Sequence, residues 1–145
     1  MSIISAQHNC AAPSDTLAVG VRVGEGLAPG SVVLLVGPLG AGKTVLAKGI
    51  ARGLDITEEI SSPTYTIISE YRWKRGWLHH VDLYRIDSRD QMVNLGLEDM
   101  LRGDSIVIVE WGEKLEPLLD IPYTKITLTM NANGGRDIFI EEYRQ

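Results

Sequence analysis

The chain has 145 residues, a net charge of −5 and a pI near 5.1. This length allows one domain with one hydrophobic core and is too short for two. Hydrophobic residues make up 44% and charged residues 23% of the sequence, as in ordinary globular proteins. The acidic balance argues against tight DNA or RNA binding by the chain alone, because such binding needs a basic face.

The cysteine count and the N-terminal segment bear on location. Cys10 is the single cysteine, so no intramolecular disulfide can form, which suits a reducing compartment. The first residues lack the basic and then apolar regions of a signal peptide. The apolar runs are also far shorter than a membrane span. We therefore expect one domain over residues 1–145, located in the cytoplasm.

The first predicted elements are a helix and a strand. The pattern predicts a helix from Ser14, as its N-cap, to about Leu27. Gly20 and Gly24 either weaken this helix or mark a place where it packs closely. Residues 32–36, VVLLV, form an apolar run rich in β-branched side chains, which predicts a buried strand.

The rest of the chain alternates between predicted helices and strands. In chain order these elements are a helix 43–52, a hairpin 65–73 and 77–84, a helix from Ser88 to about Leu101 with a Ser88–Gln91 capping box, a strand 105–110, a short helix 113–119, and a closing hairpin 125–130 and 137–142. This order predicts an α/β fold, namely a P-loop NTPase-like three-layer sandwich with a central mixed sheet and inserted and terminal β-hairpins.

Residues 37–44, GPLGAGKT, match the phosphate-binding pattern G-x-x-x-x-G-K-[ST]. Glycines allow the backbone to curl so that successive N–H groups face an anion. The helix that follows adds unpaired N–H groups and the positive end of its dipole. Lys43 supplies a point charge for the β and γ phosphates, and Thr44 a hydroxyl for Mg²⁺. A buried strand before the loop and a helix after it favour nucleotide binding over a plain glycine turn.

Two acidic residues could assist the magnesium ion. Glu110 follows the apolar strand IVIV, the usual position for a metal-binding acid beside a phosphate loop. Asp82, the first residue of DLYR, ends the strand that precedes it. It could hold the metal's water shell or position the attacking water. His79 and His80 point to opposite faces of one strand, so we expect one core histidine and one exposed histidine rather than a metal site.

The nucleotide and the reaction are less constrained by these patterns. The guanine-reading pattern N-K-x-D is absent from the sequence, which favours ATP. A small-molecule phosphotransferase remains an alternative, although no compact arginine-rich lid follows the loop. A nucleotide-gated binding module without hydrolysis is a further alternative.

Five blocks together resemble the TsaE family, formerly YjeE, over roughly residues 32–115. They are GPLGAGKTVLAKGIARGL, SSPTYTIISEY, HHVDLYRI, NLGLEDML and IVIVEWGEKL. The resemblance implies an ATP- and Mg²⁺-dependent ATPase needed for threonylcarbamoyladenosine (t6A) at adenosine 37 of tRNA. It also implies two protein partners, TsaB and TsaD, through which tRNA is reached, and hydrolysis that is slow without them.

The resemblance also assigns roles to residues at matching positions. Lys43, Asp82 and Glu110 are expected to serve catalysis, and Thr44 and Glu110 to bind Mg²⁺. Residues 62–66 match a nucleotide-responsive loop. The family commonly has Thr where this chain has Val45, which loses a hydroxyl but keeps the backbone N–H. The expected nucleotide contacts are Gly37, Gly40, Ala41, Gly42, Lys43, Thr44, Val45 and, from the last hairpin, Gly135.

Overall fold

The computed structural model describes residues 2–60 and 67–144, leaving aside the side chains of residues 2–4. The expected nucleotide-responsive loop, residues 62–66, lies outside the described residues. So do the first two residues of the strand predicted over 65–73.

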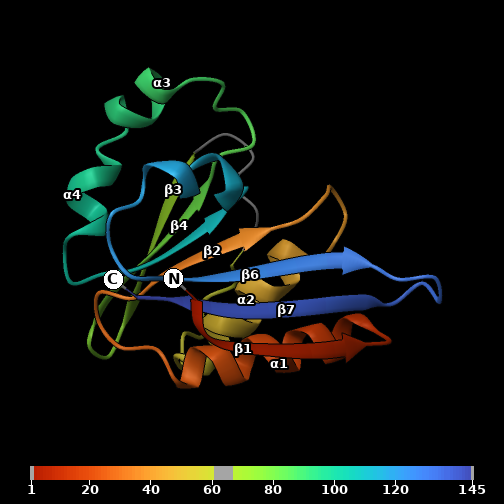
Figure 1. Cartoon of the computed structure of the whole chain (residues 1–145). Helices are drawn as coiled ribbons and strands as arrows, with labels where there is room; N and C mark the ends of the chain where they lie inside the picture. Colours follow the sequence, from red (N-terminus) through yellow and green to blue (C-terminus); the bar gives the residue numbers. More distant parts are fainter. Residues whose placement is uncertain (1, 61–66, 145) are drawn as a thin grey trace.

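One mixed sheet of seven strands organises the molecule, in the order β1-β7-β6-β2-β5-β4-β3 (Figure 1). Strands β2, β4, β5 and β6 run parallel in its centre, while β1, β7 and β3 join antiparallel at the sides. The strands are β1 (Ser2–Cys10), β2 (Val32–Val36), β3 (Ile68–Trp73), β4 (Gly76–Asp82), β5 (Ile106–Glu110), β6 (Tyr123–Met130) and β7 (Arg136–Tyr143).

Helices cover both faces of the sheet (Figure 1). They are α1 (Pro13–Glu25), α2 (Lys43–Gly53), α3 (Arg89–Asn94) and α4 (Leu97–Leu101), with two 3₁₀ turns, η1 (Gly112–Lys114) and η2 (Glu116–Leu118). Alternate residues of β2 enter different cores: Val33 and Leu35 pack on the α1–α2 side, and Leu34 on the side of α3, α4 and the turns. The predicted α/β fold with a central mixed sheet and a terminal hairpin is confirmed.

Glycines allow α1 and α2 to touch along their backbones. A Cβ added at Gly49 or Gly53 of α2 would collide with backbone atoms of α1, next to Gly20 and Gly24 respectively. Of the two readings of Gly20 and Gly24, close packing is therefore the correct one. This contact fixes α2, whose first residue is Lys43, against the rest of the fold.

Helix α1 does not begin as predicted. The N-cap position is Ala12, and Pro13 is the first helical residue, so Ser14 lies inside the helix. The backbone N–H groups of Ala11 and Ala12 instead donate to the Asp15 carboxylate, each at 3.1 Å. A proline at the first helical position has no N–H that needs a partner, and an acid in the first turn suits the helix dipole.

The helix predicted from Ser88 to Leu101 is two helices. The Ser88–Gln91 capping box is present, but Gly96 adopts φ 72° and separates α3 from α4. Left-handed backbone of this kind interrupts a helix and favours glycine. In place of the short helix predicted over 113–119, the structure has the two 3₁₀ turns η1 and η2. Strand β1 was not predicted from the sequence pattern.

Candidate functional site

The glycine-rich loop connects the carboxyl end of β2 to the start of α2, as the sequence predicted. Gly37, Gly40 and Gly42 all have positive φ, at 155°, 80° and 103°, which side chains with a Cβ rarely adopt. A Cβ at Gly37 would in addition lie 2.5 Å from the Leu128 carbonyl oxygen of β6. The loop therefore needs its glycines both for its turns and for its contact with the neighbouring strand.

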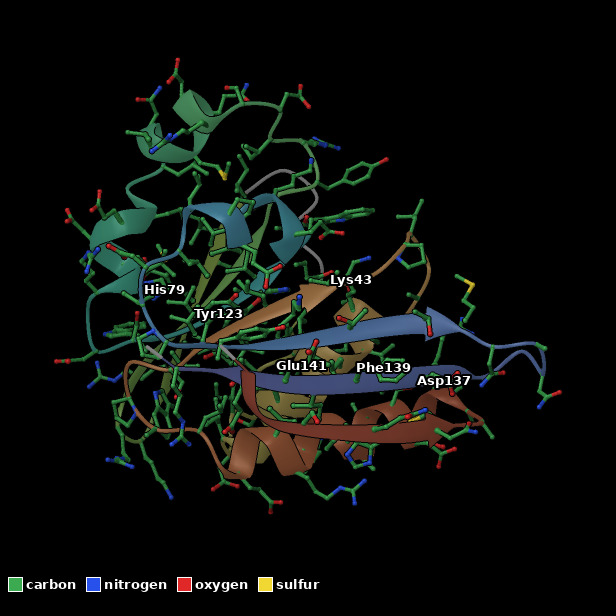
Figure 2. The ribbon with its side chains drawn as sticks, viewed as in Figure 1. Lys43, His79, Tyr123, Asp137, Phe139 and Glu141 are labelled. Carbon is green, nitrogen blue, oxygen red and sulfur yellow. The ribbon has the colours of Figure 1, made fainter. Side chains whose placement is uncertain are left out.

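Lys43 is folded over this loop and lies near the carboxyl end of β2 (Figure 2). Its Nζ donates to the carbonyl oxygens of Gly37 at 2.6 Å and Pro38 at 2.9 Å. The same Nζ lies 4.1 Å from the ring centroid of Trp111, within the range of a cation–π contact. Burial lowers the pKa of the Lys43 ammonium, opposed by the negative charges of Glu110, Glu113 and Asp82.

Thr44 and Glu110 meet at the start of α2. The Thr44 Oγ1 lies 3.1 Å from Oε1 and 3.2 Å from Oε2 of Glu110, and Glu110 is only 3% exposed. Ligand oxygens on adjacent corners of an octahedral Mg²⁺ site lie about 3 Å apart, given bonds of about 2.0–2.1 Å. The two side chains therefore fit the predicted Mg²⁺ pair.

His80 is the third member of this buried cluster. Its Nε2 lies 2.6 Å from Oε2 of Glu110, and the residue is 0% exposed. His79 points to the other face, 3.5 Å from Glu70, with its side chain 16% exposed. The prediction of one core histidine is confirmed, and His79 is only partly exposed. The contact of His80 with Glu110 was missed, because it depends on the order of strands in the sheet.

Asp82 reaches the same edge of the sheet. It is level with Glu110 in the parallel pair β4–β5, so the carboxyl ends of both strands meet at the loop. Its Oδ1 accepts the backbone N–H of Tyr84 at 2.9 Å. The negative charge of Asp82 also opposes the lowering of the Lys43 pKa by burial. The structure thus brings Lys43, Thr44, Glu110 and Asp82 together.

Trp111 has a backbone conformation that is unusual for its residue type. Its φ of 60° and ψ of 40° lie in the left-handed region, which costs energy for a residue with a bulky side chain. The ring packs at 5.2 Å from the Tyr84 ring and lies beneath the Lys43 ammonium. Strain of this kind is typical of functional sites, and here it places an aromatic ring against Lys43.

A pocket of about 220 Å³ adjoins the loop on the side of the last hairpin. Its lining includes the predicted contacts Gly40, Gly42, Val45 and Gly135. A Cβ at Gly135 would lie 2.5 Å from the Cys10 carbonyl oxygen, so this glycine is needed where the hairpin meets the end of β1. The structure therefore brings Gly135 to the loop.

Arg136 is a site residue to which the sequence analysis gave no role. Its Nε donates to the Ala41 carbonyl at 3.0 Å, and its Nη2 to the Gly40 carbonyl at 3.1 Å. The two partners are 95 and 96 positions away in the chain. No local pattern could have revealed the contact.

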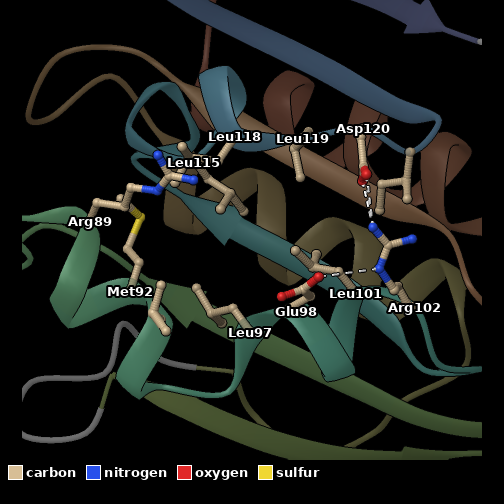
Figure 3. Close-up of a pocket in the computed structure, with 12 residues that line it drawn as sticks. Arg89, Met92, Leu97, Glu98, Leu101, Arg102, Leu115, Leu118, Leu119 and Asp120 are labelled. Carbon is tan, nitrogen blue, oxygen red and sulfur yellow. Dashed lines mark hydrogen bonds and ion pairs between the residues drawn. The ribbon is translucent and has the colours of Figure 1, made fainter.

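A second pocket, of about 330 Å³, lies between α3, α4 and η2 (Figure 3). Apolar side chains such as Met92 and Leu97 line it, and Arg102 bridges Glu98 and Asp120 at its rim. None of the predicted nucleotide or metal residues contributes to it. The residues predicted to bind nucleotide and metal therefore do not line this pocket.

The described residues contain neither a cluster of metal-ligating side chains nor a membrane-spanning helix. Within residues 2–60 and 67–144, no group of three or more His, Cys, Asp and Glu side chains could hold a metal ion. Over the same residues, no helix combines the length and the apolar character that a membrane crossing requires.

Comparison with known proteins identifies the family. Residues 10–138 match the family model "Threonylcarbamoyl adenosine biosynthesis protein TsaE". The TsaE proteins of Nostoc sp. PCC 7120 and Treponema pallidum are 42% and 40% identical over 132 and 126 residues. These alignments cover 88% and 87% of this chain and 80% and 93% of those proteins.

The fold is also shared with a solved structure. The crystal structure of Bacillus subtilis YdiB has a TM-score of 0.78 and 30% identity, and the match covers 98% of this chain and 87% of that one. Sequence and fold thus agree over nearly the whole chain. The chain belongs to the TsaE family of threonylcarbamoyl adenosine biosynthesis proteins.

Proposed function

We propose that the loop over residues 37–44 binds ATP with Mg²⁺ and hydrolyses it. The observation that supports this most directly is the convergence of Lys43, Thr44 and Glu110 at the loop. Lys43 would transfer its N–H donors from loop carbonyls to the β and γ phosphates. The backbone N–H groups at the start of α2 would hold the same phosphates.

Thr44 and Glu110 are the residues that would hold the metal, and Asp82 would orient the attacking water at the same edge of the sheet. Bound Mg²⁺ supplies positive charge that neutralises the phosphate oxygens as the bond to the leaving group breaks. The adenine base of ATP would occupy the pocket beside Gly42, Val45 and Gly135, because this pocket adjoins the loop.

We propose that this ATPase serves t6A modification of tRNA together with TsaB and TsaD, in the cytoplasm. Membership of the TsaE family supports the pathway and does not favour a small-molecule phosphotransferase. The net charge of −5 supports contact with tRNA through the partners. The guanidinium of Arg136 donates its hydrogen bonds to backbone carbonyls. Arg136 is thus not free to stabilise the transition state, and we infer that a partner supplies such a cation, so that hydrolysis is slow without the partner.

Phosphate release tests the proposal when it is measured for the chain alone and with TsaB, TsaD and tRNA. We expect slow release alone and clear stimulation by the partners. Lys43→Ala and Glu110→Ala should abolish the stimulated rate, whereas Lys74→Ala, in the exposed β3–β4 turn, should not. Full stimulated activity in Lys43→Ala or in Glu110→Ala would show that the site is wrongly assigned. ATP binding and complex assembly without any phosphate release would favour a binding module.

A further inference from the structure

His80 is a buried histidine for which the nucleotide mechanism above has no role. It lies in β4, level with Ile108 of the parallel strand β5. Glu110 follows two positions later and therefore faces the same side of the sheet. The sheet thus places the imidazole beside the carboxylate, and the 2.6 Å distance from Nε2 to Oε2 is that of a strong hydrogen bond.

The direction of this hydrogen bond follows from its two partners. A metal ligand carboxylate is ionised and only accepts hydrogen bonds, so a Glu110 that serves as metal ligand requires the proton of this hydrogen bond to be on Nε2 of His80. The other ring nitrogen, Nδ1, is buried and has no hydrogen-bond partner among the described residues. A neutral ring with its proton on Nε2 leaves only an unused lone pair at Nδ1, which costs less than an unpaired buried N–H.

Glu110 is therefore held from two sides. The Thr44 hydroxyl approaches both carboxylate oxygens, while His80 engages Oε2 alone. A carboxylate side chain on its own could rotate about its terminal bond, because that torsion is broad. The His80 hydrogen bond removes this freedom and keeps the second oxygen in place beside Thr44.

We propose that His80 is a positioning residue, which orients the Glu110 carboxylate for Mg²⁺ through an Nε2–H hydrogen bond. The inference rests on the proposed function, since Glu110 is a metal ligand only if Mg²⁺ binds at this site. Partners that orient metal ligands typically contribute about 10–100-fold to metal affinity or activity. The same range is expected for His80.

The first experiment examines the hydrogen bond itself, without nucleotide or metal. Nitrogen NMR of protein labelled with ¹⁵N-histidine reports which ring nitrogen carries a proton. We expect a proton on Nε2 of His80, whose signal is identified by its loss in His80→Gln. An Nε2 without a proton would overturn the proposal whatever the metal does.

The second experiment measures the affinity for fluorescent ADP at a series of Mg²⁺ concentrations and in EDTA. In His80→Leu, which lacks the donor, we expect a 10–100-fold higher Mg²⁺ requirement and unchanged affinity in EDTA. His80→Gln should retain most of the Mg²⁺ effect, because its amide nitrogen can occupy the place of Nε2. His79→Gln, on the opposite face beside Glu70, is the matched control and should behave as wild type.

The outcomes separate this inference from the proposed function. If wild-type protein binds no nucleotide, or binds it without any Mg²⁺ effect, the proposed function fails. If wild type shows the Mg²⁺ effect and His80→Leu shows it undiminished, the positioning role of His80 is wrong. Equal losses in His79→Gln and His80→Leu would contradict it as well, because of these two histidines His80 is the one hydrogen-bonded to Glu110.

Discussion

One arginine joins the last hairpin to the glycine-rich loop over residues 37–44. The guanidinium of Arg136 donates to the carbonyls of Gly40 and Ala41 and also to those of Gly134 and Gly135 of its own hairpin. Because a peptide unit is planar and trans, a carbonyl held in this way points the following N–H in the opposite direction. Arg136 therefore fixes the N–H of Gly42 on the side of the loop that faces away from it.

Arg136→Met should weaken nucleotide binding about tenfold or more. Each hydrogen bond to a charged group contributes about 1.5–3 kcal/mol, and the variant loses both bonds to the loop. Titration with fluorescent ADP measures the affinity, and thermal unfolding checks the fold. Arg144→Met removes only an exposed pair with Glu142 and should leave the affinity unchanged. Equal affinities for Arg136→Met and wild type would show that the loop holds its shape without this arginine.

The Cys10 thiol should react slowly in the folded protein. The residue is 2% exposed, and burial raises the pKa of its thiol, partly offset by a hydrogen bond with Thr16. Since the thiolate is the reactive form, a raised pKa leaves less of it at neutral pH. A thiol reagent should modify Cys10 far faster in denaturant than in buffer, and the native rate should still be rising above pH 9. Similar rates in both conditions would contradict this.

At the scale of elements, the contact of α1 with α2 positions the first turn of α2, where we propose that phosphate binds. The backbones of the two helices touch at Gly20 and Gly24 of α1 and Gly49 and Gly53 of α2. Helices usually pack at axial distances of about 8–10 Å, and small residues allow the shorter distances. Side chains cannot absorb an error in such a contact, because the colliding atoms belong to the backbone.

Gly49→Ala should therefore destabilise the protein by about 1–3 kcal/mol or more, the range for an overpacked core. Its methyl group would meet the Leu17 carbonyl oxygen of α1. Gly26→Ala is the matched control at the end of α1, where the nearest atom to the new Cβ is 3.7 Å away. Urea denaturation gives both free energies of unfolding. Equal stabilities for Gly49→Ala and Gly26→Ala would mean that the helices can move apart freely.

The sequence predicted those elements that carry their own pattern. The runs 32–35 and 106–109 are buried on both faces and are continuous apolar stretches. Strand β1 carries no such pattern, because Ser5, Ala6 and Gln7 are exposed along the edge of the sheet. The break at Gly96 was missed because apolar residues recur at helical spacing on both sides of it.

The candidate site divides in the same way. Lys43 and Thr44 belong to a contiguous motif, and Glu110 follows an unmistakable buried strand, so the sequence alone sufficed to predict them. His80 and Arg136 act through partners 30 and 95 positions away. Strand order and register bring these partners together, and a single sequence does not encode either in a local pattern.

At the scale of the whole molecule, ligand binding should raise the free energy of unfolding and the Tm. With ADP and Mg²⁺ at 100 times the dissociation constant, the folded state gains about 2.7 kcal/mol. That corresponds to roughly 5–10 °C in Tm for a chain of this size. EDTA should reduce the shift for wild type, whereas Glu110→Ala should show the same smaller shift with and without Mg²⁺. Scanning calorimetry measures Tm, and a full Mg²⁺ effect in Glu110→Ala would place the metal elsewhere.

Lys43 has a final consequence for the speed of binding. Its ammonium group donates to the carbonyls of Gly37 and Pro38, and Lys43 is only 5% exposed, so these hydrogen bonds hold the loop curled around a buried lysine. Capture of a nucleotide at the proposed site would then exchange the oxygen acceptors of Lys43 for phosphate oxygens, with the backbone of Gly37 and Pro38 already in place. We expect the association rate constant of the nucleotide to depend on ionic strength, as for charged partners that meet by diffusion. Low concentrations of denaturant, at matched viscosity, should change it only weakly.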